Sequence, residues 1–98
     1  MNIYYLMVEA RPLPENEESK EFGGAYINCW IKSKDETSAK SKVSEYVFDE
    51  GWEIIDIEDF FIVTREIYLE EPNSLDCFDQ AVNFGIGANF YTWPIVIN

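Results

Sequence analysis

Four closely spaced carboxylates, Glu53, Asp56, Glu58 and Asp59, are the side chains of this sequence best placed to do chemistry. Carboxylate oxygens at such spacing can bind hard cations such as calcium or magnesium. They lack the Asp-x-Asp-x-Asp-Gly pattern of a calcium loop, and acids that alternate along a strand usually form a solvated outer face. We therefore expect no metal site and no cofactor.

Most catalytic chemistries lack their residues in this chain. There is no histidine, which removes the usual activation of serine or cysteine nucleophiles and histidine-ligated zinc. Cys29 and Cys77 form no Cys-x-x-Cys pair, so neither structural zinc nor thioredoxin-type redox chemistry is supported. The Gly85-Ile86-Gly87 segment is too short for a nucleotide-binding loop, and no lysine follows it. We expect a protein that is not an enzyme.

The net charge of −12 is concentrated in one part of the sequence. From Val43 onward, twelve carboxylates stand against a single base, Arg65, whereas residues 1–42 are nearly balanced. Residues 80–98 carry no charged side chain at all. Such a distribution repels nucleic acid and anionic lipid and attracts basic protein surfaces. The expected partner is a basic protein, with no nucleic acid and no membrane.

Length and the ends of the sequence predict a single domain over residues 1–98 in the cytoplasm. The first residues show no basic region ahead of an apolar stretch, and asparagine, glycine and proline interrupt the uncharged run of residues 80–98. Cys29 and Cys77 suit that compartment as reduced, buried thiols, and a lone disulfide between them is the alternative.

Two strands are predicted near the start, at residues 2–11 and 25–32, because apolar side chains alternate along both. The inward residues are Tyr4, Leu6, Val8 and Ala10 from the first strand, and Ala25, Ile27, Cys29 and Ile31 from the second. Between the strands, residues 12–22 combine two prolines with an acidic run and predict an exposed, mobile loop.

A helix is predicted at residues 34–50, where Ser33 and Glu36 have capping-box spacing. Its apolar stripe contains Ala39, Val43, Tyr46 and Val47. Gly51 ends the helix because glycine readily adopts the left-handed conformation.

Residues 52–57 are predicted to form the next strand, with Ile55 and Ile57 inward and Asp56 and Glu58 outward. Residues 59–68 allow two interpretations. In the favoured one, a tight turn leads into a separate strand at 60–68; in the other, one long strand is bent or bulged near Asp59.

The remaining elements are a helix that begins at Ser74 and stops at Gly85, and a strand at residues 86–97. Together the elements predict an α+β fold with a mostly antiparallel sheet of four or five strands and two helices on one face. The order is the β-α-β-β-α-β arrangement of ferredoxin-like domains, preceded by an extra N-terminal strand.

The predicted partner-binding surface begins at the end of the first helix. Asp49 and Glu50 lie in its last turn, where the helix dipole disfavours negative charge by roughly 0.3–1 kcal/mol per group. We call the following set the predicted acidic surface: Asp49, Glu50, Trp52, Glu53, Asp56 and Glu58. The hypothesis is a non-enzymatic module of the inhibitor or immunity type that binds a basic protein.

Two alternatives use aromatic residues instead of carboxylates. A sheet face carrying Tyr26, Trp30, Tyr91 and Trp93 could hold a small ligand, as in a sensory domain. The same open face could also join two copies of the chain as a homodimer.

Overall fold

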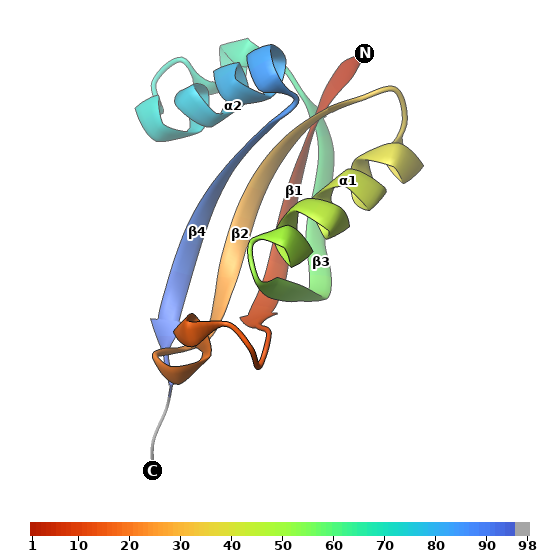
Figure 1. Ribbon diagram of the computed structural model, residues 1–98. Helices are drawn as coiled ribbons and strands as arrows, with labels where there is room; N and C mark the ends of the chain where they lie inside the picture. The colour runs from red at the N-terminus through yellow and green to blue at the C-terminus, as the bar shows by residue number, and fades with distance from the viewer. Residues whose placement is uncertain (96–98) are drawn as a thin grey trace.

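The computed structural model describes residues 1–95, which form a four-stranded antiparallel sheet with two α-helices (Figure 1). The strands are β1 (Asn2–Pro12), β2 (Phe22–Ser33), β3 (Trp52–Val63) and β4 (Ile86–Pro94), and the helices are α1 (Glu36–Asp49) and α2 (Pro72–Phe84). Short 3-10 helices, η1 (Glu17–Lys20) and η2 (Arg65–Tyr68), complete the chain. The strands lie in the order β3-β1-β2-β4. The predicted α+β class is confirmed.

The core lies between the central strands and α1. β1 and β2 pair in a register that sets Leu6 opposite Cys29 and Val8 opposite Ile27, so the alternating apolar residues of both strands share one face. All eight residues predicted to point inward from these two strands are buried there. α1 covers them with Ala39, Val43 and Val47, each of which is also fully buried.

The start of α1 differs from the predicted capping box, whereas its end agrees with prediction. Asp35 is the N-cap, and its carboxylate accepts a 2.7 Å hydrogen bond from the Ser38 amide. Ser33 is buried, and its hydroxyl donates to the Asp35 carbonyl at 3.1 Å. The N-cap is therefore Asp35 and not the predicted Ser33, because Asp35 is the last residue with extended geometry before the helix. Gly51 follows the helix with φ +89°.

β3 is one long strand, so the favoured interpretation of a separate strand at 60–68 is wrong. It pairs with β1 from Trp52 to Val63, with two register shifts that leave Ile55 and Glu58 without an opposite residue. Each extra residue changes the phase of the inward and outward alternation. Ile54 and Ile57 consequently pack against the core, while Ile55 is 52% exposed, contrary to its predicted inward position.

The ferredoxin-like order is not confirmed, because residues 52–63 form a single strand and residues 65–68 form η2. The observed order is β-β-α-β-α-β, with every paired strand antiparallel.

The expectation that both helices cover one face is also wrong. α1 packs over the face of Leu6 and Ile31, whereas α2 and η2 pack over Ile3 and Trp30, which alternate onto the opposite face.

Gly87 explains how α2 approaches the sheet so closely. A Cβ at Gly87 would lie 2.1 Å from the Cys77 carbonyl oxygen of α2, so no larger residue fits there without a shift of backbone. α2 itself starts at Pro72, earlier than the predicted Ser74, and ends as predicted at Gly85, whose φ is +96°. The last residues of the predicted final strand, 96 and 97, lie outside the described residues.

Candidate functional site

The residues of the predicted acidic surface lie on two different elements, the end of α1 and strand β3. Asp49 and Glu50 are exposed at the end of α1. Asp56 and Glu58 are exposed on β3, where Asp56 lies opposite Glu9 of β1. Glu53 is half-buried and forms an ion pair with Arg11 across the same two strands. Of these carboxylates, only Asp49 and Glu50 line a common groove.

Trp52, the apolar member of that set, is only 1% exposed. Its ring packs edge-on against Phe90 of β4, with 5.9 Å between ring centroids. A side chain so placed cannot contact a partner directly, and its inclusion among the contact residues is corrected by its burial. Trp52 instead holds the first residues of β3 against the core next to the end of α1.

A groove forms where the end of α1 meets the loop between β1 and β2. Its volume is about 540 Å³. We call it the acidic groove, and it is lined by Leu13, Glu15, Asn16, Glu17, Phe48, Asp49, Glu50 and Gly51. The groove brings together Asp49 and Glu50, which the sequence predicts as binding residues, and two further acids, Glu15 and Glu17, which are distant from them in the sequence.

Backbone and amide contacts to Gly51 hold the two sides of the acidic groove together. The Leu13 amide and the Asn16 side-chain amide both donate to the Gly51 carbonyl at 2.9 Å. Gly51 suits this position because its φ is positive, and a Cβ there would lie 2.8 Å from Asn16 Nδ2, so the Asn16 side chain would have to move. The loop that the sequence predicts to be mobile is thus hydrogen-bonded to the residue that follows α1.

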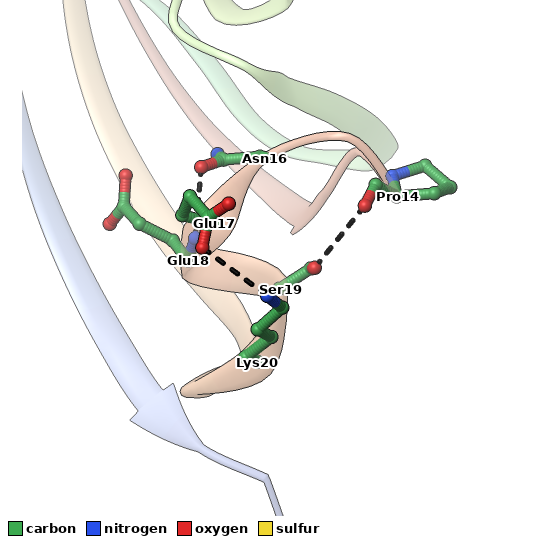
Figure 2. Close-up of polar contacts among 6 residues, drawn as sticks. All are labelled: Pro14, Asn16, Glu17, Glu18, Ser19 and Lys20. Atoms are coloured by element: carbon green, nitrogen blue, oxygen red, sulfur yellow. Dashed lines mark hydrogen bonds and ion pairs between the residues drawn. The ribbon is translucent and has the colours of Figure 1, made fainter.

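The loop side is shaped by the η1 turn (Figure 2). Asn16 caps this turn, and its side-chain oxygen accepts a 3.0 Å hydrogen bond from the Glu18 amide. The Ser19 hydroxyl lies 3.5 Å from the Pro14 carbonyl, and Lys20 forms an exposed ion pair with Glu17 at 3.4 Å. Asn16 therefore uses both ends of its amide, one to form the turn and the other to reach Gly51.

The electrostatics of the acidic groove favour a cation. None of the described residues that line it is basic, and four of them are carboxylates, of which Glu17 also pairs with Lys20 just outside the lining. The C-terminal end of the α1 dipole adds partial negative charge at the same place. Phe48, which is 63% exposed, offers an aromatic ring beside the carboxylates. Such a site suits a lysine or arginine side chain, whose apolar stem can lie on a ring while its charge meets carboxylates.

A second groove, of about 370 Å³, lies between α1 and the start of β4 and differs in charge. Its lining contains the base Lys42 together with the acids Glu45 and Asp49, so the groove carries both signs of charge. The Lys42 ammonium also donates to the Lys32 carbonyl at 3.0 Å. The acidic groove is therefore the better candidate for binding a charged partner.

The predicted aromatic face is only partly formed. Tyr26 and Tyr91 are exposed and lie opposite each other on β2 and β4, and the Trp93 ring packs 5.1 Å from the Tyr26 ring. We call Tyr26, Tyr91 and Trp93 the aromatic strip. Trp30 does not belong to it, because η2 and α2 cover it and the Tyr68 ring lies 5.7 Å away. Its exposure, at 2%, corrects the prediction.

Polar side chains adjoin the aromatic strip in the middle of that face. The Tyr5 hydroxyl donates to the Asn28 side-chain oxygen at 2.7 Å, and the Cys77 thiol donates to Asn89 at 3.2 Å. Burial raises the pKa of Tyr5 to about 12, with a smaller contribution from the nearby Asp59 charge. Tyr5 accordingly stays a neutral hydrogen-bond donor near neutral pH.

Comparison of the chain with protein-family models, curated proteins and solved structures gives no significant match. Within residues 1–95, no three cysteine or carboxylate side chains converge in a way that could hold a metal ion. Neither helix in this part of the chain combines the length and the apolar character needed to cross a membrane.

Proposed function

We propose that this protein is a non-enzymatic binding module that receives a basic partner protein in the acidic groove. The observation that carries the proposal is a groove lined by four carboxylates from two distant segments and by one exposed aromatic ring. A lysine or arginine of the partner would place its charge among Glu15, Glu17, Asp49 and Glu50. Its apolar stem would lie on Phe48.

The position of two of these acids supports a binding role over a stabilising one. Asp49 and Glu50 stand at the negative end of the α1 dipole, where their charge opposes the fold rather than supporting it. A bound cation neutralises these two charges and removes their unfavourable interaction with the helix dipole. The complex is therefore stabilised relative to the free protein. The net charge of −12 also attracts a basic partner over a distance and speeds the first encounter.

This mode of action is that of an acidic inhibitor or immunity protein, which covers a basic surface of its partner. We place the protein in the cytoplasm, where Cys29 and Cys77, both free thiols in the structure, would stay reduced.

A direct test uses a short oligolysine peptide as the probe and two matched triple variants. One variant, Glu17→Gln with Asp49→Asn and Glu50→Gln, removes three charges from the acidic groove. The other, Asp56→Asn with Glu58→Gln and Asp59→Asn, removes three charges from β3. Titration calorimetry at low salt should show that the groove variant loses about tenfold in affinity and the β3 variant about twofold. Equal losses in the two variants would mean that only total charge matters and would refute the groove as the site.

A second candidate function rests on the aromatic strip. Tyr26 and Tyr91 offer two exposed rings next to the amide groups of Asn28 and Asn89, a combination that suits a flat aromatic ligand. A titration with such a ligand that quenches tryptophan fluorescence equally at low and high salt would favour this candidate, because stacking is not screened by ions.

A further inference from the structure

The two edges of the sheet differ in how well they are protected against pairing with another strand. Exposed edges are usually blocked by charged side chains, bulges or prolines. β3 has four carboxylates and two register shifts. β4 has no charged side chain, and its pairing with β2 is regular except beyond Trp93. Its one proline, Pro94, is the final residue of the strand. β4 is thus an edge without the usual protection.

The hydrogen-bond pattern of β4 shows which backbone groups face the free side. The Lys32 amide donates to the Gly85 carbonyl at 3.0 Å, just before the strand begins. In an antiparallel pair, residues that exchange hydrogen bonds alternate with residues that do not. Counting in steps of two along the register assigns the bonds with β2 to the odd-numbered residues of β4. The amide and carbonyl groups of Ala88, Phe90 and Thr92 therefore point away from β2.

We propose that this free edge pairs with β4 of a second copy of the chain. The two strands would run antiparallel about a twofold axis and join the two sheets into one. Such pairing is self-complementary, because each copy offers the same alternating donors and acceptors to the other.

The distribution of charge favours a second copy of the chain as the partner of the β4 edge. Two chains that each carry −12 repel one another over most of their surfaces, and the β3 edge would oppose carboxylate to carboxylate. The segment from residue 80 onward is free of charged side chains, so two copies can meet there without that repulsion. A strongly basic partner, by contrast, gains no charge complementarity from β4.

Exposed apolar side chains lie on β4 and in the last turn of α2 just before it, and the second copy would cover some of them. Phe84 is 82% exposed at the end of α2, and Tyr91 is 53% exposed within β4. Val82 and Ile95 are also exposed. Burial of such groups adds to the backbone hydrogen bonds of the pair.

Sedimentation velocity of the whole chain over a range of concentrations tests the proposal. The expected result is a reversible species of twice the 11.5 kDa monomer mass. Its dissociation constant should fall as salt rises, because screening weakens the repulsion between two acidic chains. Binding of oligolysine should weaken under the same change, so the two associations are distinguishable. A monomer at every concentration and salt would overturn the proposal.

Variants at Thr92 locate the interface. Thr92 is exposed and its amide points to the free edge, so Thr92→Pro removes a donor to the second copy while leaving the pairing with β2 intact. Thr92→Val keeps the amide and is the matched control. We expect Thr92→Val to dimerise like the wild type and Thr92→Pro to weaken the dimer about tenfold.

Thr92→Glu gives a second way to block the edge without a change of backbone, in case proline disturbs the fold. The added carboxylates should weaken the dimer most at low salt. Dimers of wild-type strength in both Thr92→Pro and Thr92→Glu would show that the copies meet elsewhere and would overturn the assignment to β4.

Discussion

The two outer strands of this sheet are made of very different residues. β3 carries Glu53, Asp56, Glu58 and Asp59 and is irregular, whereas β4 is uncharged and almost regular. Both are edge strands of the same sheet, and both belong to a chain with a large negative charge. The difference shows that charge is distributed by region, so that one side of the molecule repels a second copy and the other does not.

The two edge strands are nevertheless joined through the core. Trp52, the first residue of β3, packs its ring against Phe90 of β4 on the face covered by α1. A change at this contact therefore affects both edges at once and has the largest expected effect.

Trp52→Ala should lower the free energy of unfolding by about 3–5 kcal/mol, because it removes a large buried ring and leaves a cavity. Urea unfolding at fixed protein concentration measures the loss, and Trp52→Phe should lose much less because most of the contact remains. A loss under about 1 kcal/mol for the alanine variant would show that Trp52 does not connect the two edges.

Gly87→Ala should be the next most damaging change, because the added methyl group meets the Cys77 carbonyl and pushes α2 away from β4. We expect a loss of about 3 kcal/mol in stability. Gly85→Ala is the matched control: its methyl group meets no atom within 4 Å, so only the positive φ costs energy, about 1–2 kcal/mol.

Hydrogen exchange distinguishes the two glycine variants further. Amides of α2 should exchange faster in Gly87→Ala than in Gly85→Ala, because only the former separates the helix from the sheet. Equal exchange in the two variants would contradict the close packing of α2 on β4.

Much of the fold could be predicted from the sequence because the local signals were strong. Alternation in β1 and β2, the apolar stripe of α1 and the stop at Gly51 all correspond to observed elements. The bulge at Glu58 agrees with the second interpretation, one long strand bulged near Asp59. The bulge at Ile55 could not be found, since an extra residue in a strand depends on the partner strand and breaks the alternation without a local signal. The side of the sheet on which α2 lies was missed for a similar reason. The position of α2 depends on the missing side chain at Gly87, which lets the helix approach, and on the burial of the large Trp30 ring beneath α2 and η2.

The candidate site was predicted only in part. Asp49 and Glu50 were identified by their conflict with the helix dipole, a local property. Glu15 and Glu17 were missed because they reach the same groove only through hydrogen bonds between the loop and Gly51, which no spacing along the sequence reveals. For Trp52 the sequence allows both a core position after the Gly51 turn and a contact with the partner, and its burial decides for the core. The prediction of Trp30 on an open aromatic face is wrong, because elements distant in the sequence cover it.

Thiol labelling compares the centre of the sheet with the β4 side. Burial raises the pKa of Cys29 to about 12 and also raises the pKa of Cys77, so neither thiol is reactive in the folded protein at neutral pH. Cys77 lies in α2, and we expect α2 to separate from the sheet more readily than β1 and β2 separate from each other. We expect it to be labelled about tenfold faster than Cys29 in native conditions.

Mass spectrometry of the labelled peptides measures both rates. Equal rates would show that α2 opens only when the whole domain unfolds. Thermal melts with and without reductant should coincide, because Cys29 and Cys77 pack on opposite faces of the sheet and are not bonded to each other.

The smallest predicted effect compares the two ends of α1. Hydrogen bonds from Ser38 lower the pKa of Asp35 in the folded state. A lowered pKa means that Asp35 stabilises the fold above its unfolded pKa of about 3.9, and that this contribution is lost as pH falls through the folded value. Asp35→Ala should therefore lose stability at neutral pH and show a weaker decline in acid.

Removing the acids at the other end of α1 should have the opposite sign. Asp49→Asn with Glu50→Gln should stabilise the protein slightly at neutral pH, because these charges oppose the helix dipole. Urea midpoints measured from neutral to acidic pH check both variants. Destabilisation by the second pair would contradict a binding role for these two acids.

The central claim is that a basic partner binds the acidic groove while β3 and β4 remain free of it. Its most direct test is an NMR titration of the isotope-labelled protein with oligolysine, followed through the backbone amides. We predict saturable shifts centred on Leu13 to Glu17 and Phe48 to Gly51, with little change at Ala88, Phe90 and Thr92. Shifts centred instead on Asp56 to Asp59, or spread evenly over all carboxylate-bearing residues, would contradict it.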